Sequence, residues 1–215
     1  YSWFTNLTNS TTGGIPSGSA PSLNPITAVV GTAYVYCVIT QTGPGCSTLT
    51  TIASQVTVVT APTVSTQPLA TQTLCINGTP TNLSVAYTNG TGTPTYQWYS
   101  NVNATNVGGT AIAGATNATY TPPTNTAGTF NYYCVVSLSG AGCGSITSSA
   151  SQVIVNALPT ISTQPIAGGT ICLGGTPSAF SVAYTGGSGT ATYQWYSNST
   201  NTNSGGAAIV GATSS

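Results

Sequence analysis

The sequence predicts an all-β protein built from tandem two-sheet sandwiches, and three observations point to this fold class. A 97-residue period runs through the chain, because Cys75 recurs as Cys172 and Trp98 recurs as Trp195. Short apolar runs alternate with polar residues, and clusters of Gly, Pro and Asn separate these runs. No stretch shows a 3.6-residue apolar period with helix caps, so we expect almost no helix.

Two segments of the chain, residues 62–118 and 159–215, show the strongest repetition. "PTVSTQP" at residue 62 recurs as "PTISTQP" at residue 159, and about three in five positions of 62–118 are identical in 159–215 without a gap. Such agreement indicates tandem duplication. We therefore expect a complete unit in residues 62–158, the second part of a unit in residues 1–61 and the first part of a third in residues 159–215. Both chain ends are interpreted as cuts in a longer repeat array.

Within one unit the strands follow each other in a regular order. "NLSVAYT" places Leu83, Val85 and Tyr87 on one face, "TYQWYS" places Tyr96 and Trp98 on one face, and "QVIV" closes the unit. Several short strands with turn residues between them are typical of a sandwich. The joins "VTAP" and "NALP" are too short to act as flexible linkers, so neighbouring units should be stiffly coupled.

The composition excludes most chemistry, because the 215 residues contain no Asp, Glu, Lys, Arg or His. General acid and base catalysis, an activated nucleophile and carboxylate metal sites all need such groups. We therefore expect no enzyme activity, no metal and no cofactor. The chain also has no basic face for nucleic acid. Its longest apolar stretch, 26–39, is interrupted and shorter than the roughly 20 residues that span a bilayer, so we expect no membrane insertion.

Several segments together carry a resemblance to a known family: "STQP", "LCINGTPTNLSV", "YQWYS", "IAGATNATYTPP", "AGTFNYYCVV" and "CGSITSSASQVIVN". The chain resembles the bacterial immunoglobulin-like repeats of large secreted surface proteins and adhesins, notably those that Bacteroidota export by the type IX route. The resemblance implies tandem immunoglobulin-like β-sandwich domains. It implies strands C to G in residues 1–61, a complete domain in 62–158, and strands A to C or C′ in 159–215.

The resemblance also implies roles for single residues. Trp3, Trp98 and Trp195 correspond to the core Trp of strand C, and Tyr132 lies two residues before Cys134, as in a tyrosine corner. The first copy departs from this pattern, with Val at the position of Tyr132. Val85 takes the place of the strand B cysteine of antibody domains, so a disulfide between strands B and F is not expected.

Each complete unit has three cysteines, so one per unit is left over. Relatives with two cysteines match Cys75 and Cys143, which favours that disulfide. The alternatives are the hairpin pair Cys134 with Cys143, repeated as Cys37 with Cys46, the pair Cys75 with Cys134, and buried free thiols. The disulfide candidates are Cys37, Cys46, Cys75, Cys134, Cys143 and Cys172.

Glycosylation would protect a neutral chain from aggregation, since the chain has no charge repulsion. Sequons N-x-S/T occur at Asn6, Asn9, Asn77, Asn82, Asn89, Asn103, Asn117 and Asn198, although a chain this rich in Asn, Thr and Ser has many by chance. O-linked sugar is an alternative. Tyr99 and Tyr133 alternate out of phase with the expected core, which suggests aromatic groups that cover the seam between domains or stack on sugars.

These observations favour a structural role outside the cell. The first hypothesis is a stalk or spacer segment of a long extracellular adhesin or surface filament, which extends or anchors a binding tip. The alternative is a subunit of a self-assembling extracellular filament or sheath, joined by strand exchange between partial domains. A third is a carbohydrate-binding module. The expected partners are neighbouring repeats or subunits of the same protein, together with host, surface or glycan ligands at the cell surface.

Overall fold

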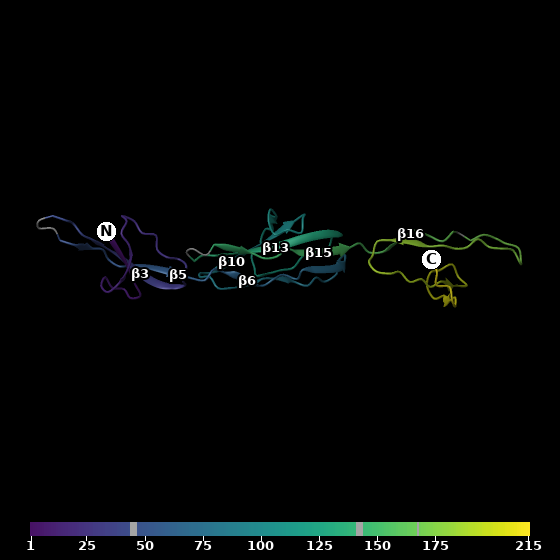
Figure 1. Ribbon diagram of the computed structural model, residues 1–215. Coiled ribbons are helices and arrows are strands. Elements are labelled where there is room, and N and C mark those ends of the chain that lie inside the picture. The colour runs from purple at the N-terminus through teal and green to yellow at the C-terminus, as the bar shows by residue number, and fades with distance from the viewer. Residues whose placement is uncertain (44–46, 141–143, 167) are drawn as a thin grey trace. The chain divides into compact units, whose positions relative to one another are not determined.

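The computed structural model describes residues 1–43, 47–140, 144–166 and 168–215 (Figure 1). Every regular element within these ranges is a β-strand, which confirms the all-β fold class. The backbone groups into two compact units, one comprising Tyr1–Thr66, Val85–Gln97 and Val135–Thr147, the other Gln67–Ser84, Trp98–Cys134 and Ser148–Ser215.

Residues 1–61 form one sheet, in the order β2-β1-β3-β4 with β5 also paired to β3. Its strands are β1 (Ser2–Asn6), β2 (Ile15–Gly18), β3 (Gly31–Ile39), β4 (Leu49–Thr50) and β5 (Ser54–Val58). All pairs are antiparallel, with Trp3 opposite Cys37 and Phe4 opposite Tyr36. Because neighbouring residues of a strand point to opposite faces, Trp3 and Cys37 share one face of this sheet, and Phe4 and Tyr36 share the other.

Residues 62–158 form a larger sheet and a second layer. The strands are β6 (Thr63–Thr66), β7 (Thr71–Cys75), β8 (Leu83–Ser84), β9 (Ala86–Thr88), β10 (Pro94–Asn101), β11 (Thr110–Ala111), β12 (Thr119–Tyr120), β13 (Gly128–Leu138), β14 (Ser145–Thr147) and β15 (Ser151–Asn156). The large sheet has the order β11-β10-β13-β15-β7 with β14 on β13, and β7 runs parallel to β15. The second layer consists of the antiparallel pairs β6–β9 and β8–β12.

The core of residues 62–158 is filled by apolar side chains of both layers. Trp98 of β10 is fully buried and its ring lies 5.8 Å from that of Tyr120 of β12, which in turn lies 5.3 Å from the ring of Tyr132 of β13. Leu83 and Val153 are also fully buried. Each such side chain stabilises the fold by about 1.5–3 kcal/mol. Apolar burial therefore takes a large part in stabilising this repeat, whose sequence has no charged side chains to form ion pairs.

Residues 159–215 form two short ladders. The strands are β16 (Thr160–Thr163), β17 (Ala183–Thr185), β18 (Tyr196–Ser197) and β19 (Ala207–Ala208), paired as β16–β17 and β18–β19. The β16–β17 pair repeats the register of β6–β9, with Thr160 opposite Thr185 as Thr63 is opposite Thr88. The facing hydroxyl oxygens are 3.2 and 3.1 Å apart respectively. Sequence duplication therefore produces the same local structure.

Candidate functional site

The junction between residues 1–61 and 62–158 is held by a turn of the following sandwich. Gly90, between β9 and β10, donates its N–H to the carbonyl oxygen of Thr60 at 3.0 Å. A Cβ at Gly90 would overlap Leu138 Cδ1 and would lie 3.1 Å from Pro62 Cβ. Its φ of 76° lies in the left-handed region that favours glycine. The turn therefore packs against the join, and only glycine fits there.

The junction between residues 62–158 and 159–215 repeats this arrangement. Gly187 donates its N–H to the carbonyl oxygen of Ala157 at 2.7 Å, and these two residues lie 97 positions after Gly90 and Thr60. A Cβ at Gly187 would lie 3.3 Å from Pro159 Cβ. Both joins thus make a backbone hydrogen bond to a turn glycine that follows them in the chain.

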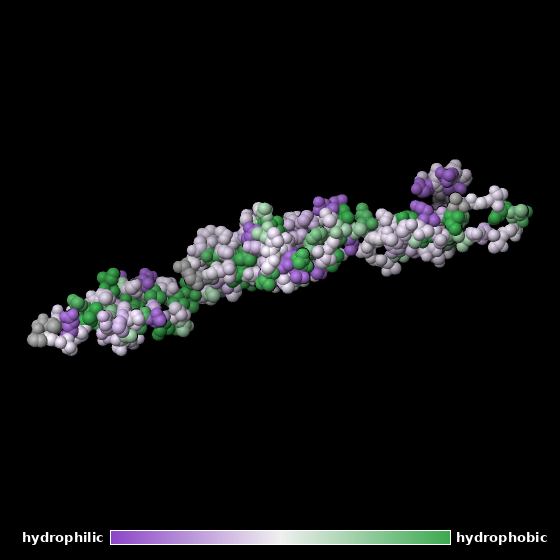
Figure 2. All heavy atoms as spheres, turned by 90° about the horizontal axis from the view of Figure 1, so that it is seen from above, coloured by the Kyte–Doolittle hydropathy of each residue, from purple (hydrophilic) through white to green (hydrophobic). Residues whose placement is uncertain are grey.

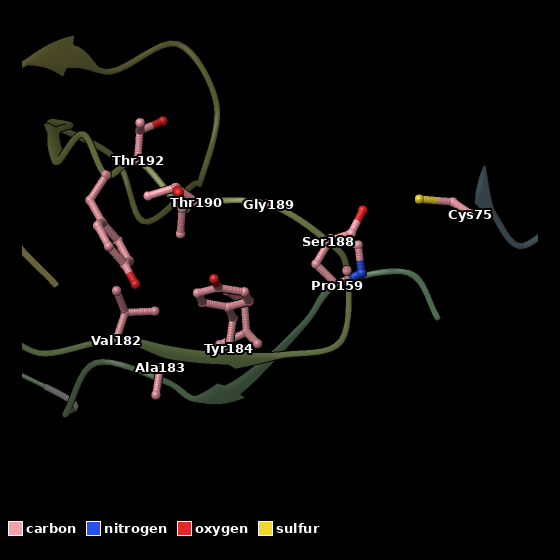
Figure 3. A pocket seen from close by; sticks show the side chains of 13 residues that line it. Cys75, Pro159, Val182, Ala183, Tyr184, Ser188, Gly189, Thr190 and Thr192 are labelled. Atoms are coloured by element: carbon pink, nitrogen blue, oxygen red, sulfur yellow. The ribbon is translucent and has the colours of Figure 1, made fainter. Parts of the chain in front are cut away.

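An apolar hollow of about 490 Å³ opens beside the second junction. Figure 3 shows Tyr184 and Val182 along one side of it, Thr190 and Thr192 across from them, and Cys75 on the far side of Pro159. None of its lining residues can carry a positive charge, and the tyrosine and cysteine side chains are the only ionisable groups in it. The hollow can hold apolar side chains.

A loop on the outer face of the large sheet is organised by one asparagine. Asn101, at the end of β10, donates from Nδ2 to the carbonyl oxygens of Thr105 and Val107 at 3.1 and 2.9 Å, and its Oδ1 accepts the N–H of Asn103 at 3.2 Å. Asn198 makes the equivalent bonds in the third repeat, and Asn6 in the first. From the sequence, Asn6 and Asn198 were recognised only as sequons, and Asn101 was not singled out. The sequence did contain a signal for this role, because an Asn follows the Trp-containing strand segment in all three repeats.

This loop covers the aromatic pair that the sequence had suggested as a seam or a sugar platform. Tyr133 is only 4% exposed, and its ring stacks on Tyr99 with centroids 5.1 Å apart and planes 5° apart. Its hydroxyl accepts the N–H of Gly109 at 3.0 Å. Both interpretations are therefore wrong for Tyr133, because its own repeat encloses it.

The first repeat contains the same anchored tyrosine. Tyr36 stacks on Phe4 with centroids 5.3 Å apart, and its hydroxyl accepts the N–H of Gly14 at 3.3 Å. The tyrosine that binds the loop backbone is thus the residue after the Tyr132 position, on the opposite face of the strand.

Each of the three tryptophans makes the same kind of hydrogen bond, from its indole Nε1 to a backbone carbonyl oxygen 17 or 19 residues later in the chain. Trp98 Nε1 donates to the carbonyl oxygen of Asn117 at 2.9 Å, Trp3 Nε1 to that of Ala20 at 2.9 Å, and Trp195 Nε1 to that of Ser214 at 2.7 Å. Trp98 is fully buried, whereas Trp3 and Trp195 are half-buried. Each indole thus binds the loop that follows β2, β11 or β19 in its own repeat.

The cysteines are distributed over different environments. Cys37 and Cys134 are buried, Cys75 is half-buried and Cys172 is exposed; Cys37, Cys75 and Cys172 carry free thiols in the structure. Cys46 and Cys143 lie outside the described residues. The pairings with Cys46 and Cys143 therefore stay predictions. The backbone N–H groups of the two buried cysteines both donate hydrogen bonds to side-chain hydroxyls. Cys134 N–H donates to Ser148 Oγ and Cys37 N–H to Thr51 Oγ1, both at 2.9 Å.

The sequon asparagines lie at the surface. Asn6 is half-buried and the other seven are exposed. Asn82 accepts a hydrogen bond from Thr121 at 2.7 Å, and Asn77 and Asn89 have positive φ angles of 63° and 64°. Their glycosylation stays a prediction. Sugar attached at Nδ2 of Asn6 or Asn198 would replace one of the two amide hydrogens, so that side chain would lose at least one of its bonds to the loop.

The electrostatics of the described residues are those of a neutral scaffold. Burial raises the pKa of Tyr132 to about 12, with a further contribution from Tyr120, whose own pKa is raised by burial. Within the described ranges there is no group of three or more potential metal ligands among His, Cys, Asp and Glu side chains. In the same part of the chain no helix is both long and apolar enough to cross a membrane.

The sheet order, the parallel pair β7–β15 and the buried Trp in β10 form the arrangement of an immunoglobulin-like sandwich. The chain is a tandem of immunoglobulin-like domains. In the usual letters β6 is strand A, β7 is A′, β8 and β9 are B, β10 is C, β11 is C′, β12 is E, β13 is F and β15 is G.

A family model described as a domain of unknown function (DUF8696) matches residues 64–157. No curated protein matches the chain significantly. Among solved structures the chain is similar to an I-band fragment of titin, with 14% identity and a TM-score of 0.43 over 76% of this chain and 57% of that one. It is also similar to immunoglobulin domains 1–5 of Sidekick-1, with 15% identity and a TM-score of 0.33 over 76% of this chain and 36% of that one. The chain thus spans less than two thirds of either structure.

Proposed function

We propose that this chain is a structural, non-catalytic spacer of a long extracellular adhesin or surface filament, where it extends or anchors a binding tip. The observation that carries the proposal is the repeated junction. At both joins a turn glycine, Gly90 or Gly187, donates its N–H to the carbonyl oxygen of the next-to-last residue of the preceding repeat, Thr60 or Ala157. A spacer needs such direct coupling, because a flexible join would not hold a tip at a fixed distance.

The repetition itself favours length over recognition. Residues 62–118 and 159–215 share their junction, their core Trp and their Asn-built loop, whereas a unique binding site seldom recurs in every copy. A strand of ten or eleven residues at about 3.3 Å per residue spans about 33–36 Å, so each domain should add a length of about 30–40 Å. The neighbouring repeats of the same protein are therefore its main partners.

Deletion of one whole unit, residues 62–158, from the native protein tests the spacer role. The deletion joins Ala61 directly to Pro159 and keeps the same junction, because Gly187 then takes the place of Gly90. We expect surface display and ligand specificity to persist, while the reach measured by electron microscopy of labelled tips shortens by one domain. Loss of binding with unchanged reach would show that the unit carries recognition. Retention of glycans by residues 62–158 on an array would instead support a carbohydrate-binding module.

A second candidate is the self-assembling filament, which the exposure of apolar side chains in residues 1–61 favours. Leu7, Ile15 and Val29 are 83, 74 and 73% exposed. These three side chains line one apolar hollow, which apolar side chains of a neighbouring repeat or subunit would fill.

A further inference from the structure

The chain has no charged side chain, so a reaction that creates one changes its electrostatics directly. Figure 2 shows its most hydrophilic residues, Asn and Gln, as purple groups scattered over the surface. An Asn side chain becomes a carboxylate by hydrolysis of its amide, and Asn is accordingly one of the thermolabile residues. The reaction is fastest where Gly follows Asn, because glycine has no side chain to hinder its backbone nitrogen. Two such pairs occur, Asn77–Gly78 and Asn89–Gly90.

The backbone nitrogen of the glycine is the nucleophile of this reaction. It attacks Cγ of the asparagine and forms a new N–Cγ bond, while the Cγ–Nδ2 bond breaks. The hydrogen of the glycine nitrogen leaves with the amide nitrogen as ammonia. Water, the one co-reactant, then opens the cyclic imide at either carbonyl and gives aspartate or isoaspartate. A hydrogen bond from the glycine N–H slows the reaction, because the nitrogen must leave its acceptor before it can reach Cγ.

The two pairs differ in what holds the glycine nitrogen. Asn77 and Asn89 are both exposed, and their φ angles are 63° and 64°. The glycine after Asn77 donates its N–H at 2.9 Å to the carbonyl oxygen of Cys75, within one tight turn. The glycine after Asn89 donates its N–H at 3.0 Å to the carbonyl oxygen of Thr60, in residues 1–61. The first junction therefore holds the nitrogen that would attack Asn89, whereas a local turn holds the one beside Asn77.

The second junction makes the same contact without the reactive amide. Gly186 stands 97 positions after Asn89 and has a φ of 76°, and the N–H of the next residue, Gly187, is bound by Ala157. Glycine and asparagine both tolerate this left-handed backbone. The turn therefore does not require an asparagine, and of the two junctions only the first can be altered in this way.

We propose that Asn89 is a site of spontaneous deamidation that the hydrogen bond of the first junction holds in check, so that opening of this junction leads to a permanent chemical change. The product carries a carboxylate, and the chain has no cationic side chain to neutralise it. Isoaspartate also adds one methylene to the backbone before Gly90, which displaces the N–H from Thr60. Because the reaction is irreversible, the altered junction stays weakened. The inference concerns this one contact and does not rest on the spacer role.

Peptide mass spectrometry of the unsubstituted chain, made without N-glycosylation and aged at neutral pH, tests the proposal. The rates of deamidation at Asn77 and Asn89 are measured in the folded chain and in the chain unfolded by urea. Hydrogen exchange of the Gly90 N–H is measured in the same folded sample. We expect folding to slow deamidation at Asn89 by about the factor by which it slows exchange of this N–H, because one local opening frees the nitrogen for both reactions.

Leu138→Ala loosens the first junction, because Leu138 Cδ1 packs against Gly90. We expect deamidation at Asn89 to become about tenfold faster, which corresponds to about 1.4 kcal/mol in the free energy of opening. The rate at Asn77 should stay unchanged, since its glycine is held within its own turn. Val153→Ala is the matched control: Val153 is also buried but pairs near the opposite end of β13 from Leu138, so neither rate should change.

Other results would overturn the proposal. Equal rates at Asn89 in the folded and the unfolded chain would show that the junction does not hold the attacking nitrogen. Faster deamidation of Asn77 and Asn89 alike in Leu138→Ala, or of Asn89 in Val153→Ala to the same extent, would assign the control to the whole repeat. An unfolded chain in which Asn77 reacts and Asn89 does not would exclude the site. None of these results would change the reach expected after deletion of residues 62–158, so the spacer role is judged separately.

Discussion

Replacement of Gly90 by Ala perturbs the first junction at one atom. The substitution places a non-glycine residue at φ 76°, which costs about 1–2 kcal/mol. The new Cβ also overlaps Leu138 Cδ1 and lies 3.1 Å from Pro62 Cβ, so the join must shift. Such overpacking costs about 1–3 kcal/mol. We therefore expect Gly90→Ala to lower the free energy of unfolding by about 2–5 kcal/mol.

Gly108 provides a matched control in the same repeat. Its φ is 73°, but a Cβ there would have nothing within 4 Å. Gly108→Ala should therefore show the backbone cost alone, about 1–2 kcal/mol. The free energy of unfolding of this repeat can be measured for both variants in the full chain. The probe is the hydrogen exchange of the buried Trp98 indole N–H at increasing urea concentration. Equal destabilisation within about 0.5 kcal/mol would refute the reasoning, because the junction would then not pack against Gly90.

Three further outcomes test the site. Tyr133→Phe removes the acceptor of the Gly109 N–H and should cost about 1 kcal/mol in urea unfolding, with no loss if that bond is absent. Asn101→Ala should speed amide exchange throughout the loop that it organises, whereas Asn103→Ala, which keeps its backbone N–H, should not; equal effects would contradict the assigned role. Burial raises the pKa of Tyr132 to about 12, so the folded state favours the neutral phenol. Its stabilising effect should be complete below about pH 10, the ordinary pKa of tyrosine, and should be lost as the pH rises through 12. Thermal melts should show this loss, and they should show a smaller one in Tyr132→Phe.

Much of the fold could be predicted because each repeat carries its own pattern. The alternation around Trp98 and the turn residues between runs define strands without knowledge of their partners. The parallel pairing of β7 with β15 was not predicted, because it joins segments about 80 residues apart and depends on how the layers close. Local sequence carries little information about such a pair.

The roles of Tyr133 and Gly90 were harder to predict, because they too depend on residues that are distant in the sequence. Tyr133 was assigned to the surface from strand alternation alone, which identifies two faces but not whether a loop covers the outer one. The role of Gly90 depends on Pro62 and Leu138, and neither neighbour follows from the sequence around the glycine. By contrast, the shortness of the joins can be read directly from the sequence, and the stiff coupling that it suggests between neighbouring repeats stays a prediction.

The central claim is that each repeat adds length through a directly coupled junction. Small-angle X-ray scattering should compare the 215-residue chain with chains lengthened by one and by two further copies of residues 62–158. We expect the maximum dimension to grow by about 30–40 Å for each added copy, because ten or eleven residues of strand at about 3.3 Å per residue span about 33–36 Å. Growth well below this value, or growth that falls with each copy, would show that the repeats fold back or swing freely and would contradict the spacer role.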